Sequence, residues 1–273
     1  MSERRAMAGA IPTASRSEAP PDHVVEARGV SMVYPGNVTA LAGVDIGFAR
    51  GQLTTLLGPS GCGKTTLLKI IAGLIEPTGG EILIEGRPVR GPGPERAFVF
   101  QDFALMPWAT VLRNVAFGLE LRGVPKAERE EIARRCIAEV RLAGFEHSYP
   151  HQLSGGMRQR VGLARALAVD AEILLMDEPF ASVDEQTRRK FQEDLLALLE
   201  VEKKTVIFVT HSIEEAVYVS DQIVLLSERP GRVSKIVRPG LDRSGDFERI
   251  RRERAYLDCV DEIWNVLKRY LED

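Results

Sequence analysis

Short apolar runs alternate with helix-like stretches through most of this chain. Nearly continuous apolar residues occupy 53–57, 173–176, 206–209 and 223–226. Runs of this length without polar interruption are typical of strands buried on both faces, as in a parallel sheet covered by helices. The pattern therefore predicts an α/β fold.

Helical spacing fills the stretch near 126–143. Ile132, Cys136 and Val140 recur every fourth residue, which places them on one face of a helix. Gly144 follows, and glycine commonly ends a helix because it adopts the left-handed conformation with little strain. We therefore expect this helix to end at Gly144.

Changes in composition divide the chain into three parts. Residues 1–22 are rich in Ser, Ala, Pro and Arg and lack the apolar block of a secretion signal, so a disordered tail is expected, with a targeting role as the alternative. A folded unit is expected over 23–240, with strands before a turn at 35–37 and mostly helix over about 108–168. Residues 241–273 are expected to form a linker and an amphipathic helix.

The C-terminal part carries one expected apolar helix face. Spacings of three, four and seven residues place its members together: Ile250, Leu257, Val260, Trp264, Leu267 and Leu271. This face either packs on the chain's own fold or contacts a partner subunit.

Charge and cysteine content exclude several classes of protein. There are 36 basic and 39 acidic side chains, giving a net charge of −3 and a pI of about 5.9. No nucleic-acid partner is expected, because such proteins usually show a basic excess. The three cysteines form no CxxC pair, which disfavours disulfides and zinc and fits a reducing cytosol. No apolar run approaches the roughly 18–20 residues that span a bilayer.

The segment 58–65, GPSGCGKT, carries the chemistry of phosphate binding. It fits G-x-x-x-x-G-K-[ST] and lies between an expected strand and an expected helix. Glycines permit turns whose N–H groups point at anionic oxygens, and the helix start adds its positive dipole. Lys64 can reach the β- and γ-phosphates, and the Thr65 hydroxyl can coordinate Mg²⁺. The candidate nucleotide-binding residues are Gly58, Pro59, Ser60, Gly61, Cys62, Gly63, Lys64, Thr65 and Thr66. Because kinases, GTPases and motor ATPases carry the same loop, the class stays open at this point.

Polar residues follow two of the apolar runs. Asp177 and Glu178 end the run ILLMDEP, and ligands of open α/β sheets bind beyond the carboxyl ends of strands. Asp177 can hold Mg²⁺ through water, and Glu178 can polarise an attacking water. His211 follows the run at 206–209, where it is either a surface residue or a donor to charge that develops on a γ-phosphate.

The segment LSGGMRQR at 153–160 resembles the signature sequence of ATP-binding-cassette (ABC) ATPases, whose usual form is LSGGQ. A serine and two glycines before an expected helix over 157–168 form a second anion site without a lysine. The resemblance implies a homodimer, in which the phosphate loop of one subunit and the signature of the other enclose each ATP. Candidate nucleotide contacts are then Ser154, Gly155 and Gly156.

The resemblance covers about 24–240 and implies roles for further residues. Tyr34 is expected to stack on adenine, which is a largely base-independent contact. Gln101 is expected to contact Mg²⁺ and the attacking water. His211 matches the switch histidine, and Asp184 matches the aspartate of the loop after the catalytic glutamate.

Two positions depart from the family pattern. Met157 stands where the signature usually has glutamine, and Ala181 stands where the loop ASVD usually begins with serine. Neither change is expected to abolish activity.

The implied fold is a P-loop NTPase core with a parallel sheet flanked by helices, an N-terminal antiparallel β region and a helical subdomain that carries the signature. Segments 86–101, 105–115 and 227–233 are similar to ATPases of nitrate, taurine and aliphatic-sulfonate importers. That similarity implies an ATP-hydrolysing subunit at the cytoplasmic side of the inner membrane, working with permease subunits and a separate solute-binding protein. The alternatives are the ATPase of a separately encoded exporter and a soluble cassette ATPase outside transport.

In this family the region after Gln101 receives a short helix of the membrane subunit. The resemblance therefore implies a permease contact near residues 101–108. The candidate partner contacts are Leu105, Met106 and Trp108, and burial within the chain's own fold is the alternative for them.

Overall fold

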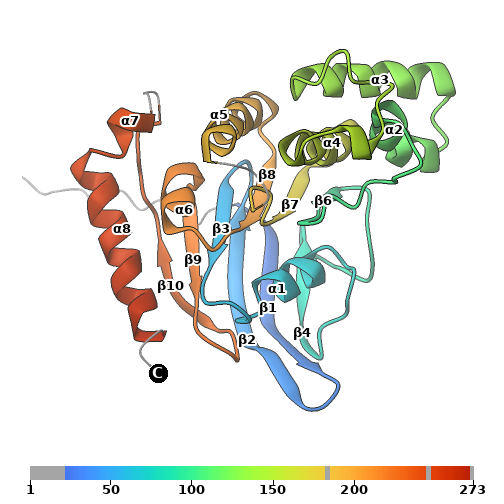
Figure 1. The fold of residues 1–273 in the computed structure, drawn as a ribbon. Coiled ribbons are helices and arrows are strands. Elements are labelled where there is room, and N and C mark those ends of the chain that lie inside the picture. The colour runs from blue at the N-terminus through green and yellow to red at the C-terminus, as the bar shows by residue number, and fades with distance from the viewer. Residues whose placement is uncertain (1–21, 182–184, 244–246, 271–273) are drawn as a thin grey trace, which may run out of the picture.

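The computed structural model describes residues 22–181, 185–243 and 247–270 of the chain. Two sheets lie side by side with a group of helices at one end and two further helices at the other side (Figure 1). The tail expected over 1–22 lies outside the described residues except for Asp22, and Asp184 and Leu271 also lie outside them.

The central sheet has six strands in the order β10-β9-β3-β8-β7-β6. All neighbours pair in parallel except the edge strand β10, which is antiparallel to β9. Every residue of β3, β7, β8 and β9 is buried, which confirms the expectation of strands covered on both faces. The strands are β3 (Leu53–Leu57), β6 (Arg96–Val99), β7 (Ile173–Asp177), β8 (Thr205–Val209), β9 (Gln222–Leu226) and β10 (Val233–Val237).

The second sheet is antiparallel, with the order β2-β1-β4-β5, and confirms the N-terminal β region. Gly36 and Asn37 form the turn between its first two strands with φ of 85° and 59°. One hydrophobic cluster joins this sheet, helix α1 (Lys64–Ile71) and one face of the central sheet. The strands are β1 (His23–Tyr34), β2 (Val38–Ala49), β4 (Gly79–Ile84) and β5 (Arg87–Pro88).

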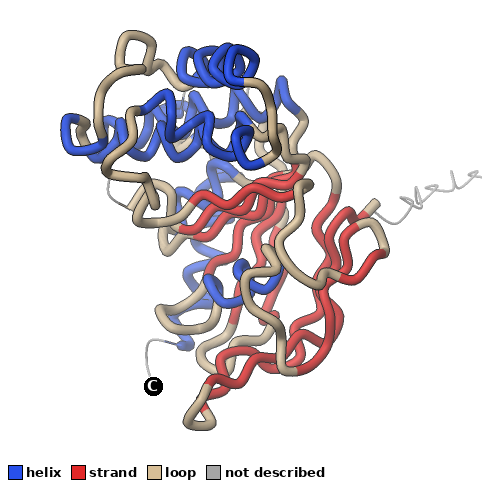
Figure 2. Tube along the Cα trace, turned by 90° about the vertical axis from the view of Figure 1, so that its right-hand side faces the viewer, coloured by secondary structure: helices blue, strands red, loops and turns tan. Residues whose placement is uncertain are grey.

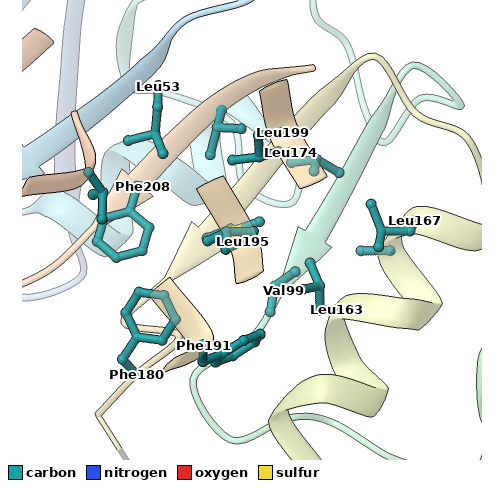
Figure 3. Close-up of a cluster of buried hydrophobic side chains, with 14 of the residues drawn as sticks. Leu53, Val99, Leu163, Leu167, Leu174, Phe180, Phe191, Leu195, Leu199 and Phe208 are labelled. Carbon is teal, nitrogen blue, oxygen red and sulfur yellow. The ribbon is translucent and has the colours of Figure 1, made fainter. Parts of the chain in front are cut away.

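The other face of the central sheet is covered by helices. Figure 3 shows Phe180, Phe191, Leu195 and Phe208 in the resulting core, with rings of Phe180 and Phe191 edge to face at 5.2 Å. The covering helices are α5 (Glu185–Glu202) and α6 (Ile213–Val219), and they are joined to the helical group by α4 (Gly155–Ala168). A packed core on both faces fixes the strand ends at which the polar residues lie.

Three α-helices form the group at one end of the molecule, which Figure 2 shows as a cap on the sheets. They are α2 (Val111–Leu121), α3 (Lys126–Glu139) and α4, and the 3₁₀ turn η1 (Pro150–Gln152) precedes α4. They pack on one another through apolar side chains. The exact limits of the subdomain, expected over about 108–168, stay a prediction.

The end of α3 differs from the expectation. The helix ends at Glu139 rather than at Gly144, because Arg141 already adopts the left-handed conformation with φ of 58°. The N–H of Leu142 donates to the carbonyl of Ile137 and the N–H of Arg141 to that of Ala138, both at 2.9 Å. This pair of bonds is a Schellman motif, which satisfies the last carbonyls without glycine.

The C-terminal helix also differs from the expectation. The chain forms α7 (Phe247–Ile250) and then α8 (Arg254–Leu267), followed by the 3₁₀ turn η2 (Lys268–Tyr270). Helix α8 buries Tyr256, Cys259 and Ile263. Leu257 and Trp264, expected on the buried or partner face, are about half exposed. The single continuous helix expected from Ile250 onward was therefore wrong, whereas contact of the exposed side chains with a partner subunit stays a prediction.

Within the described ranges, no helix is both long enough and apolar enough to cross a membrane. The three cysteines of the sequence are free and buried. Burial raises the pKa of the Cys136 and Cys259 thiols to about 11 each.

Candidate functional site

In the loop between β3 and α1, the side chain of Lys64 folds back onto the carbonyls of the same loop. Gly61 and Gly63 have φ of 78° and 99°, the left-handed conformation that glycine adopts most easily. Lys64 is 6% exposed, and its Nζ donates to the carbonyls of Gly58 and Pro59 at 2.7 and 2.9 Å. The loop therefore holds a buried ammonium at the start of a helix, which is the charge arrangement that binds phosphate.

Thr65 and Asp177 meet at the carboxyl end of β7. The Thr65 hydroxyl donates to Oδ1 of Asp177 at 2.9 Å. Burial raises the pKa of Asp177, and the nearby charge of Glu178 adds to this, whereas the Thr65 hydrogen bond opposes it. The arrangement brings two hard oxygen donors side by side next to the phosphate loop.

Glu178, one residue after β7, and His211, two residues after β8, form a pair. Oε2 of Glu178 lies 3.3 Å from Nδ1 of His211. Glu178 has φ of 45°, and its N–H donates to the carbonyl of Val209 at 3.0 Å. A left-handed glutamate costs on the order of 1–3 kcal/mol, and such strain is concentrated at functional sites. Glu178 thus faces His211, whereas Asp177 accepts from Thr65.

Glu215, which was not expected from sequence, holds the segment that carries His211. This carboxylate is 8% exposed and accepts hydrogen bonds from the Thr210 hydroxyl at 2.5 Å and the Gln192 amide at 3.0 Å. Burial raises the pKa of Glu215, and the Thr210 hydrogen bond opposes that rise. The signal available in the sequence was a second glutamate beside Glu214, which is exposed.

Tyr34 lies at the first turn of α1. Its hydroxyl oxygen is 3.2 Å from the Thr66 hydroxyl, and the side chain is half-buried. The structure therefore brings Tyr34 to the phosphate loop, across the boundary between the two sheets.

Gln101 and the signature residues lie apart from this cluster. Gln101 is exposed after β6, and Ser154 caps α4 by accepting from the N–H of Met157 at 3.3 Å. In the described ranges, neither Gln101 nor the signature Ser154, Gly155 and Gly156 makes a hydrogen bond to the phosphate loop. Helix α4 begins at Gly155, two residues before the expected start, because the serine cap lies directly before the glycines.

The segment after Gln101 is tied to the signature helix. Phe103 and Ala104 have φ of 60° and 44°, and their carbonyls accept from the Arg165 guanidinium at 2.8 and 2.6 Å. Arg158 of the same helix lies over the Phe103 ring, 5.7 Å from its centroid. Two arginines of α4 thus contact the residues that follow Gln101.

Asn114 holds the loop before α2 in one shape, and this was not expected from sequence. Its fully buried amide donates to the carbonyls of Met106, Ala109 and Thr110 at 3.0–3.2 Å and accepts from the N–H of Met106 at 2.8 Å. The fixed loop leaves Trp108 74% exposed. A polar residue amid the apolar VLRNVAF was the signal that could have revealed it.

Leu105 and Met157 pack partly against the main hydrophobic core. Leu105, a candidate partner contact, is therefore partly buried within the chain's own fold, whereas the exposed Trp108 is accessible to a partner. Ala181 is exposed, and its N–H donates to the carbonyl of Glu178 at 3.1 Å.

Comparison with known proteins gives consistent relatives. The profile of a family described as ABC transporter matches residues 41–181. An uncharacterized ABC transporter ATP-binding protein of Methanocaldococcus jannaschii is 54% identical over 86% of this chain and 87% of its own length. The taurine import ATP-binding protein TauB of Pseudomonas entomophila is 54% identical over 77% of this chain and 82% of its own.

A solved structure also matches over most of the chain. It is the dimeric structure of a post-hydrolysis state of an ATP-binding cassette bound to ADP and Pi. The match has a TM-score of 0.71 and 32% identity, and covers 81% of this chain and 100% of the other. The phosphate loop, the carboxylate pair and the capped helix α4 thus occur here within a fold that is known to hold nucleotide.

Proposed function

This chain belongs to the ABC transporter family, and from that premise we propose that it is the ATP-hydrolysing subunit of an importer for taurine, an aliphatic sulfonate, nitrate or a related small molecule. ATP binding, ATP hydrolysis and the importer class follow from the family and its relatives. The observation that carries the choice of solute is the identity of about half of the aligned residues with taurine import ATP-binding proteins.

The proposed hydrolytic roles follow from the strand ends. Lys64 leaves the carbonyls of Gly58 and Pro59 to neutralise the β- and γ-phosphates, and Glu178 accepts a proton or hydrogen bond from the attacking water. His211, 3.3 Å from Glu178, donates to oxygen on which negative charge develops. Gln101 reaches this site through movement of the segment that Arg165 holds.

The Thr65 hydroxyl and Asp177 carboxylate fit Mg²⁺, because they are adjacent hard oxygen donors and leave further positions for phosphate oxygens and water. Mg²⁺, when bound, neutralises charge on the β- and γ-phosphates. Gln101 is the third proposed contact to the ion, as the family resemblance implies. Neither Thr65 nor Asp177 has to move far, since their oxygens already lie 2.9 Å apart.

A homodimer would complete two such sites. The signature Ser154, Gly155 and Gly156 opens the 14-residue helix α4, yet makes no hydrogen bond to the phosphate loop of its own chain in the described ranges. A helix start of this kind binds anions, so it fits the γ-phosphate held by the other subunit. Tyr34 is assigned to the adenine ring on the opposite side of the phosphate loop.

Trp108 is proposed to dock the permease subunit at the cytoplasmic face of the inner membrane. Replacing Trp108 by Ala is expected to weaken binding of the permease by about 30-fold, because an exposed tryptophan on a rigid loop has the character of an interface hot spot. Binding would be measured by titrating labelled chain onto detergent-solubilised permease. The matched control is Leu121→Ala, since Leu121 is 72% exposed on the end of α2. Equal losses for both variants would refute the docking role of Trp108.

The solute is tested on the assembled transporter. With permease subunits and a separate solute-binding protein reconstituted, we expect taurine, an aliphatic sulfonate or nitrate to raise ATP turnover several-fold, because solute binding in such an importer is coupled to closure of the ATP sites. The comparison solutes are a sugar and a dipeptide at the same concentration. Stimulation by the sugar or the dipeptide alone would overturn the proposed solute class, and ATP-driven efflux of any solute would favour the exporter.

A further inference from the structure

The turn between β9 and β10, residues 227–232, packs behind the phosphate loop. Gly231 of this turn lies beside β2 in an isolated parallel bridge with Leu41. Its N–H donates to the carbonyl of Ala40 at 2.9 Å, and its carbonyl accepts from the N–H of Ala42 at 3.1 Å. The turn is thus fixed to β2, which is itself in contact with the phosphate loop.

Gly231 has no space for a side chain. A Cβ at this position would lie 2.0 Å from the carbonyl oxygen of Cys62 and 3.2 Å from Cδ2 of Leu41. Gly231 is not among the glycines with positive φ, so alanine is excluded here by contact and not by backbone conformation. The atom that alanine would displace belongs to the main chain of the phosphate loop.

Two glycines of the phosphate loop itself also pack closely against main-chain carbonyls of neighbouring strands. A Cβ on Gly58 would lie 2.8 Å from the carbonyl oxygen of Leu226, the last residue of β9 before the turn. A Cβ on Gly63 would lie 2.9 Å from the carbonyl oxygen of Ala40. The loop that cradles phosphate therefore rests against β2 and the β9–β10 turn together.

The turn is braced and does not yield easily. Oγ of Ser227 accepts from the N–H of Arg232 at 3.0 Å and lies within hydrogen-bond distance of the carbonyls of Glu228 and Pro230. The N–H of Ser227 donates to the carbonyl of Arg232 at 2.9 Å. A side chain added at Gly231 would therefore move the phosphate loop before it moved the turn.

We propose that Gly231 is a positioning residue for nucleotide binding, because its bare backbone holds the Cys62 carbonyl and with it the N–H groups of the phosphate loop in place. The proposal rests on the nucleotide-binding role of that loop. Through this contact, the β9–β10 turn keeps the phosphate loop in the same conformation when ATP is absent. Since the loop contacts phosphate in both the ground state and the transition state, Gly231 acts on affinity more than on turnover.

Gly231→Ala is expected to raise the Kd for ATP and for ADP by at least about tenfold, and the KM for ATP similarly, while kcat at saturating ATP changes by less than about threefold. The Kd would be measured by calorimetric titration of the full-length chain. The matched control is Gly91→Ala, because a Cβ at Gly91 meets no atom within 4 Å and its φ is not positive. Gly91→Ala should leave both constants within about twofold.

A second variant separates positioning from general destabilisation. Ser227→Ala loosens the turn without touching the phosphate loop, so the double variant Ser227→Ala/Gly231→Ala should recover part of the lost affinity. Ser227→Ala alone should weaken ATP binding by about three- to fivefold, as the loss of side-chain hydrogen bonds worth about 1 kcal/mol allows. If Gly231→Ala does not fold, the ATP affinity of the Ser227→Ala chain tests the proposal instead.

Three outcomes would overturn the proposal. One is a folded Gly231→Ala variant that binds ATP within twofold of the parent chain. Another is a loss confined to kcat with KM unchanged. The third is a Ser227→Ala chain, alone or in the double variant, whose ATP affinity shows neither the expected weakening nor the expected recovery. Failure of ATP binding by the parent chain itself would instead refute the nucleotide-binding role.

Discussion

A chain with Glu178 replaced by Gln is expected to hydrolyse ATP at least about 100-fold more slowly, because a positioned general base contributes about 10²–10⁴ to the rate. The amide has nearly the shape of the carboxylate and leaves the left-handed turn and the bond from the Glu178 N–H to Val209 unchanged. It cannot, however, accept a proton from the attacking water. ATP binding should persist, because Lys64 and Thr65 are untouched.

Two measurements check this expectation. Phosphate release under saturating ATP gives the turnover, and size-exclusion chromatography with ATP shows whether the variant accumulates as a dimer that cannot hydrolyse its nucleotide. The control is Glu214→Gln, a similar change of an exposed glutamate in the first turn of α6. Turnover of the Glu178→Gln chain at the parent rate would show that another group activates the water.

Loss of the Lys64 ammonium is expected to abolish ATP binding at ordinary concentrations. In Lys64→Ala the charge-assisted contacts to phosphate disappear, and at about 3 kcal/mol for such hydrogen bonds the Kd should rise by roughly 100-fold or more. In the chain without nucleotide, the carbonyls of Gly58 and Pro59 also lose their donor.

Equilibrium titration with ATP measures this change directly. The control is Lys126→Ala, because Lys126 is 77% exposed and its contact is with Glu130 at 3.9 Å. Surface ion pairs of this kind contribute about 0–1 kcal/mol, so the control should bind ATP as the parent does. A Lys64→Ala chain with normal affinity would place the nucleotide elsewhere.

Local physics explains which parts of the fold could be predicted from sequence. The strands β3, β7 and β8 are buried on both faces, so their apolar runs admit few other interpretations. The phosphate loop could be found because its glycines and lysine lie at fixed spacing within eight residues. The expectation of a helix end at Gly144 was wrong because a Schellman motif forms with Arg141, whose energy depends on where Leu142 packs.

Tertiary placement explains what could not be predicted. Glu215 and Asn114 are polar residues in apolar surroundings, and their partners Gln192 and Met106 are identified only when distant or looped segments meet. The single helix expected from Ile250 onward is divided, because the chain leaves the helix after Ile250 and α8 begins at Arg254. The proposed contact of Ser154 with nucleotide rests on family resemblance, since its hydroxyl in this chain accepts from the N–H of Met157.

The burial of all three cysteines gives the chain a practical property. Their thiols are shielded, and a raised pKa keeps them protonated, so thiol-reactive dyes react slowly with the natural sequence. Cysteines introduced at Leu121 on α2 and Val201 on α5, which are 72% and 80% exposed, would then be the reactive pair. A donor and an acceptor dye at these positions would report the distance between the helical group and the sheet core, molecule by molecule, through each cycle of ATP turnover.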